Sequence, residues 1–71
     1  MDARQTAEQR LATIRDLLTR IGRAAEAKAT RATVDWGDAG DLGAALEHAV
    51  YAACALGAIN EEEARRLGFP V

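Results

Sequence analysis

The chain has 71 residues, one Cys, one His and a formal net charge of −2. A domain of this size buries little surface and is only marginally stable unless a partner helps it. One Cys excludes an internal disulfide, and one Cys with one His supplies too few ligands for a zinc site, so we expect no cofactor and no metal.

The N-terminal stretch is polar, and it lacks the apolar core of a signal peptide. No segment approaches the roughly 20 apolar residues that span a bilayer. We therefore expect a cytoplasmic protein with no membrane partner. Hydrophobic residues make up 49% of the chain, but many of them are Ala. The sequence thus predicts a thin core in which helices pack closely through small side chains.

Charge is distributed unevenly along the chain. Residues 1–33 carry seven Lys or Arg and four Asp or Glu, a net charge of +3, whereas residues 34–71 carry two and seven, a net charge of −5. The two halves are expected to attract each other within one chain or across a dimer, or simply to present solvated faces; the alternative is that the uneven charge steers a partner.

The first predicted element is a long amphipathic helix over about residues 3–32. Its apolar residues recur three and four positions apart, which is typical of one helical stripe. Gly22 is its only Gly, and it marks either a close crossing or a bend. The stripe consists of Ala7, Leu11, Ile14, Leu18, Ile21, Ala25, Ala29 and Ala32.

Residues 33–40 break the helical period and are rich in Asp and Gly, so we expect a loop there. The spacing of its Asp residues does not match a calcium-binding loop. Either Asp38 or Asp41 is expected to cap the helix that follows. Trp36 has two interpretations in this loop, as a plug in the core or as an exposed binding anchor.

The second predicted helix covers about residues 41–57 and is apolar on nearly every side. One stripe, formed by Leu42, Leu46, Ala49, Ala53 and Leu56, is expected to face the first helix. A second set lies about half a turn away and is small and semi-polar. This set is predicted to contact another protein or to be covered within the same subunit, and it comprises Ala44, His48, Tyr51, Ala52 and Ala55.

A third, short helix is expected over about residues 61–67. Gly57 and Gly68 are predicted to end the second and third helices, and Asn60 is predicted to cap the third. Cys54 lies about 120° from His48 on the second helix, so a catalytic Cys/His pair is not expected. Cys54 is instead interpreted as a small buried hydrophobic residue.

Together these elements predict an all-α, three-helix domain that spans residues 1–71. The long first helix is expected to pack antiparallel on the central helix, with the short third helix added. Because the first helix is nearly twice as long as the second, part of its stripe is expected to stay uncovered, and a second copy of the chain would cover it.

The segment TVDWGDAGDLG, Thr33–Gly43, followed by an apolar helix, resembles a D/N-W-G-x-x-G segment of small uncharacterised proteins encoded by bacterial phages and plasmids. The resemblance covers about a sixth of the chain. It implies a genomic setting and no chemistry. In such a setting, compact acidic proteins often bind and inhibit a host protein complex, as anti-CRISPR proteins do.

The sequence therefore favours a non-enzymatic protein-interaction module whose partner is another protein, itself as a homodimer, or both. The residues predicted to form the protein interface are Trp36, Ala44, His48, Tyr51 and Ala55. The alternative is a dimeric nucleic-acid-binding regulator that contacts phosphates through Arg20, Arg23 and Arg31. No acid, base and nucleophile cluster in a way that predicts an enzyme.

Overall fold

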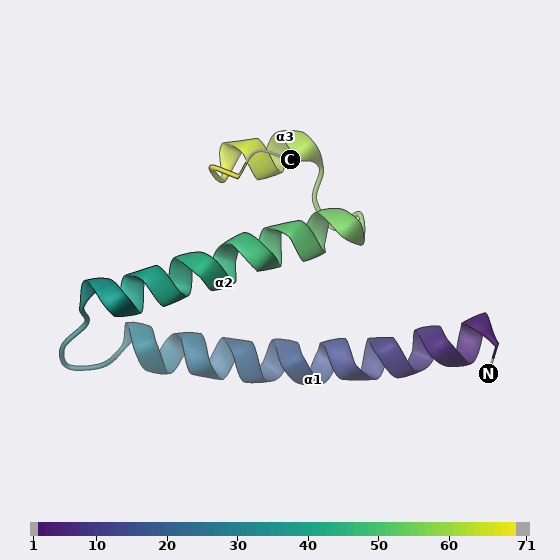
Figure 1. Cartoon of the computed structure of the whole chain (residues 1–71), viewed down its shortest axis with the longest axis horizontal. Coiled ribbons are helices and arrows are strands. Elements are labelled where there is room, and N and C mark those ends of the chain that lie inside the picture. The colour runs from purple at the N-terminus through teal and green to yellow at the C-terminus, as the bar shows by residue number, and fades with distance from the viewer. Residues whose placement is uncertain (1, 70–71) are drawn as a thin grey trace. The chain divides into compact units, whose positions relative to one another are not determined.

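The computed structural model describes residues 2–69, which contain three α-helices and no β-strand (Figure 1). The helices are α1 (Ala3–Ala29), α2 (Trp36–Ala55) and α3 (Glu61–Arg66). The predicted all-α class is confirmed. The chain divides into two compact units, Met1–Val34 and Asp35–Val71. The predictions of a single domain and of antiparallel packing between the first two helices stay predictions.

α1 begins after a reciprocal cap and ends three residues earlier than predicted. Asp2 Oδ1 accepts a hydrogen bond of 2.8 Å from the amide of Gln5, while the Gln5 side chain accepts one from the amide of Asp2. At the other end, the amide and the hydroxyl of Thr30 both donate to the carbonyl of Glu26. Thr13 and Thr19 make the same hydroxyl bond inside α1, so this bond accompanies the helix end and does not by itself cause it.

α2 begins at Trp36, so the predicted loop over 33–40 and the predicted helix start at 41 were wrong. Asp35 caps the helix, not Asp38 or Asp41. Asp35 Oδ1 accepts a 2.8 Å hydrogen bond from the Asp38 amide, and Asp38 Oδ2 accepts a 3.2 Å bond from the Asp35 amide. Gly37 leaves room for this arrangement, because an added Cβ would lie 3.2 Å from Asp35 Oδ1.

The C-terminal ends of α2 and α3 follow the predicted pattern, in which Gly adopts a left-handed conformation. Gly57 has φ 73° and Gly68 has φ 94°. The amide of Ala58 donates to the Ala53 carbonyl, and the amide of Phe69 donates in the same way to the Ala64 carbonyl. These bonds satisfy carbonyls that a helix end leaves free. Both predicted glycine ends are confirmed, although α2 ends at Ala55 and α3 at Arg66.

The predicted cap of α3 is confirmed as well. Asn60 Oδ1 accepts a 2.8 Å hydrogen bond from the amide of Glu63. Acidic residues fill the first turn of this helix, and Arg65 and Arg66 fill its last turn. Both placements suit the helix dipole. Local interactions therefore stabilise both ends of the short α3.

In the second unit, α3 packs on α2, and each of these two helices contributes one buried apolar residue. Val50 is 4% exposed and Ala64 is fully buried, and Asp38 is the buried charged residue among those described. The partly buried residues of this unit are Leu42, Ala53, Cys54, Ile59 and Phe69. The predicted stripe of the second helix is only partly covered, since Leu46 and Leu56 are 50% and 71% exposed. Val50 lies beside that stripe, and it is the most buried residue of α2.

α1 has no buried residue. Its large apolar side chains other than Leu17 fall on the predicted stripe, and the exposed fractions of those on the stripe run from 38% for Ile14 to 61% for Leu18. A single helix has no second surface against which to bury such a stripe. Within the described residues, no helix has the length and apolar character needed to cross a membrane.

Candidate protein-interaction face

The five residues predicted to form a protein interface all lie on α2 and are all exposed. Because each helical residue turns by about 100°, the five side chains span an arc of about 120° and a length of about 29 Å. We call this surface the α2 face, and it consists of Trp36, Ala44, His48, Tyr51 and Ala55. Its arc is opposite the Leu42 and Ala53 side of the helix, where unit 2 is partly buried.

Trp36 is 92% exposed, so its interpretation as a core plug was wrong. The early start of α2 explains this position. As the first residue of the helix, Trp36 projects from a regular backbone and lies within about 60° of Tyr51 around the axis. The sequence had assigned these two aromatic residues to different elements, and the structure places them on one helix.

Tyr51 is 41% exposed, and its hydroxyl donates a 3.3 Å hydrogen bond to Glu47 Oε1. Partial loss of water around the ring raises the pKa of Tyr51 above its ordinary value of 10.0. The negative charge of Glu47 and the hydrogen bond that this carboxylate accepts act in the same direction. Tyr51 is therefore a neutral hydrogen-bond donor at neutral pH.

Glu47 is a neighbour of the α2 face that the interface prediction did not include. The contact between Glu47 and Tyr51 could have been predicted from the sequence. Residues four apart on a helix are neighbours, so a Glu at this spacing can reach a Tyr hydroxyl. The contact joins two exposed side chains on successive turns of α2. A partner that accepts a hydrogen bond from the Tyr51 hydroxyl must therefore take the place of Glu47 as the acceptor.

The three Arg residues of the alternative site do not share one helical face. Arg20 Nε lies 3.0 Å from Asp16 Oδ2, in an ion pair between exposed side chains. Arg31 lies beyond the end of α1 and its cap, Thr30. The predicted alignment of Arg31 with Arg20 and Arg23 required the helix to continue to residue 32. Two of the three residues therefore remain on α1.

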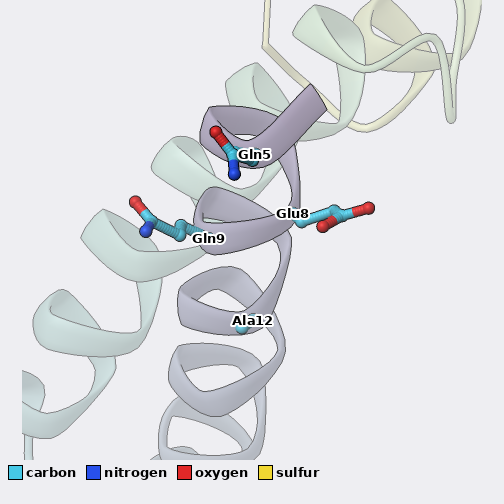
Figure 2. A pocket seen from close by; sticks show the side chains of 4 residues that line it. All are labelled: Gln5, Glu8, Gln9 and Ala12. Atoms are coloured by element: carbon cyan, nitrogen blue, oxygen red, sulfur yellow. The ribbon is translucent and has the colours of Figure 1, made fainter. Parts of the chain in front are cut away.

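The best-formed hollows among residues 2–69 do not bring an acid, a base and a nucleophile together. One is lined by Gln5, Glu8, Gln9 and Ala12, all from the first turns of α1. Figure 2 shows Glu8 extending to one side of the helix and Gln9 to the other. A single carboxylate without a partner base or nucleophile gives no basis for assigning a reaction. In residues 2–69, no group of three or more His, Cys, Asp or Glu is placed to hold a metal ion.

No family model, curated protein or solved structure matches the chain in sequence or structure comparisons. The resemblance of Thr33–Gly43 to phage and plasmid proteins therefore stays a prediction. In the structure this segment forms the linker end, the Asp35 cap and the first two turns of α2.

Proposed function

We propose that the chain is a non-enzymatic protein-interaction module and that the α2 face captures another protein. The observation that carries this proposal is the 92% exposure of Trp36 at the start of a regular helix. A large aromatic side chain in water has apolar surface to bury. Trp and Tyr are also the residues that most often dominate the binding energy of protein interfaces.

The composition of the rest of the face supports the same function. Ala44 and Ala55 are small, so a partner helix or loop can approach the α2 backbone closely. His48 and Tyr51 add hydrogen-bonding groups to a surface that carries no other charge than the neighbouring Glu47. An aromatic anchor, small residues and a few polar groups together resemble the centre of a protein interface more than its rim.

For the biological setting, we propose a cytoplasmic accessory protein of a mobile element that binds and inhibits a host defence complex of the anti-CRISPR type. This part rests on the Thr33–Gly43 resemblance and on the small size and net negative charge of the chain. The protein is expected to act as a homodimer. It requires no cofactor, because it works by occupying a surface on its target.

The direct test uses a tagged full chain to capture its target from the bacterial host, followed by binding measurements with the purified target. Trp36→Ala and Tyr51→Ala should each weaken binding by about 30-fold or more, which corresponds to about 2 kcal/mol. Gln9→Ala on α1 is the matched control and should leave affinity unchanged. If both aromatic variants bind as tightly as the parent chain with intact helicity, the α2 face is not the site.

The inhibitory role has its own test. Expression of the chain in a bacterium with an active defence system should restore plaque formation by a phage that the system restricts, and Trp36→Ala should abolish this effect.

The nucleic-acid alternative predicts instead an affinity for duplex or single-stranded DNA that falls steeply with salt and is reduced by Arg20→Gln or Arg23→Gln. This alternative has less support than the α2 face, because Arg20 is paired with Asp16 and Arg31 lies beyond the end of α1.

A further inference from the structure

α1 carries a second surface, distinct from the α2 face, whose pattern is self-complementary. Six residues form what we call the α1 stripe, and their spacing alternates between four and three positions. They are Ala7, Leu11, Ile14, Leu18, Ile21 and Ala25. The four large residues of the stripe are between 38% and 61% exposed. The next position at this spacing is Lys28, so the stripe ends there.

A strict alternation of four and three is the 3.5-residue period of helices that pair in a left-handed coiled coil. The order of side chains is also symmetrical about the middle of the helix. When two copies run antiparallel around a two-fold axis near residue 16, each Leu faces an Ile and the Ala residues face each other. The pairs are Ala7 with Ala25, Leu11 with Ile21 and Ile14 with Leu18. Each pair occurs twice, as a two-fold interface requires.

Charges beside the stripe favour the antiparallel arrangement over the parallel one. A parallel pair would bring Arg10 of each copy close to Arg15 of the other, which makes two like-charge contacts. An antiparallel pair has one approach between the two Arg15 side chains instead. It also places Leu17, which is 48% exposed, against the partner's Leu17 at the two-fold axis. Opposed helix dipoles favour the same orientation.

We propose that α1 is a self-association helix and that two copies of the chain pair antiparallel through the α1 stripe. We choose a second copy as the occupant because a two-fold pairing matches Leu with Ile and Ala with Ala along the whole stripe. The seam is about 27 Å long. This inference specifies the homodimer of the proposed function, and it uses none of the residues of the α2 face.

The mass of the full chain in solution tests the pairing. Sedimentation equilibrium should give about twice the 7.6 kDa of one chain. Leu18→Asp places a charge in the centre of the seam and should weaken dimerisation by about 100-fold or more. Gln9→Asp introduces the same charge on the opposite side of α1 and should leave the dimer intact. A parent chain that is monomeric, trimeric or tetrameric at micromolar concentrations overturns the proposal.

Disulfide trapping tests the orientation, and it does not depend on the folding of Leu18→Asp. In a Cys54→Ser background, a chain carrying both Ala7→Cys and Ala25→Cys should oxidise to a covalent dimer. Ala7→Cys alone should stay monomeric under denaturing conditions, because its equivalent lies at the far end of an antiparallel pair. Efficient cross-linking of the Ala7→Cys chain indicates parallel helices and overturns the proposed orientation. If the Trp36→Ala chain is still a dimer but no longer binds its target, then self-association and target binding use different surfaces. The two proposals can therefore fail independently.

Discussion

Asp35 and Asp38 determine where the helix with the candidate site begins. Each carboxylate accepts a hydrogen bond from the other residue's amide, so two amides that a helix start leaves free are satisfied. Asp38 is 5% exposed, so its carboxylate is largely shielded from water. The pair thereby places Trp36 at the first position of α2.

Replacement of the cap should destabilise α2. We expect Asp35→Ala to lower the free energy of unfolding by about 1 kcal/mol, because the Asp38 amide loses its acceptor. Urea unfolding followed by far-UV circular dichroism measures this loss. Asp35→Asn keeps an acceptor oxygen and should retain most of the stability. Equal losses for the Asn and Ala variants would contradict the capping role.

The titration of Tyr51 provides a second test at the residue scale. We expect the phenol to ionise above its ordinary pKa of 10.0, and Glu47→Gln should move the pKa back toward that value, because the variant removes the negative charge. Ultraviolet absorbance of the phenolate reports this directly, since Tyr51 is the only Tyr in the chain. An unchanged pKa in Glu47→Gln would show that the carboxylate does not act on the ring.

The same shift has a consequence for stability. A group whose pKa is raised in the folded protein binds its proton more tightly there than in the unfolded chain. The contribution of Tyr51 is therefore fully present below pH 10 and is lost as the pH rises through the folded-state pKa. Alkaline unfolding of the parent chain should begin at a lower pH than that of Tyr51→Phe, which has no group to ionise.

Two glycines show how the elements depend on backbone conformation. Gly57 has a positive φ after α2, whereas Gly22 lies inside α1, where an added Cβ would meet nothing within 4 Å. We expect Gly57→Ala to destabilise the chain by about 1 kcal/mol or more, and Gly22→Ala to stabilise α1 by about 0.5–1 kcal/mol. Thermal unfolding of the two variants should shift in opposite directions. A stabilising Gly57→Ala would contradict the left-handed helix end.

Helix caps that depend on a single residue were easier to predict than the start of α2. Gly57, Asn60 and Gly68 carry local signals that do not depend on the rest of the chain, and all three were interpreted correctly. The start of α2 was missed because Gly37 and Gly40, next to several Asp residues, suggested a loop. Two acidic residues three positions apart, Asp35 and Asp38, were the better signal, since each can serve the amide of the other.

At the scale of the whole molecule, two units are joined by an exposed, non-helical connection after α1. Arg31 lies in this connection. We expect brief trypsin digestion to cut first after Arg31, because protease cleavage requires local unfolding that helices resist. Mass spectrometry should then show fragments 1–31 and 32–71. Initial cuts after Arg15 or Arg20 would indicate that α1 opens more readily than the connection.

The fold class and the helix-forming segments follow from local patterns, and so do four of the five residues of the α2 face, which were placed on one helix from their spacing. Trp36 could not be added to that face, because its position depends on where α2 begins. The extent of burial was also not predictable. Leu46 and Leu56 are apolar and regularly spaced, yet only contacts between elements decide whether such residues are covered.

The exposure of Trp36 has an additional consequence, because it is the only Trp in the chain. An indole in water emits at longer wavelength than one surrounded by apolar groups, and soluble quenchers reach it easily. The unbound protein should therefore show red-shifted, quenchable fluorescence, and a partner that covers Trp36 should shift the emission to shorter wavelength. The chain thus contains its own optical probe, located at the surface where we propose that binding occurs.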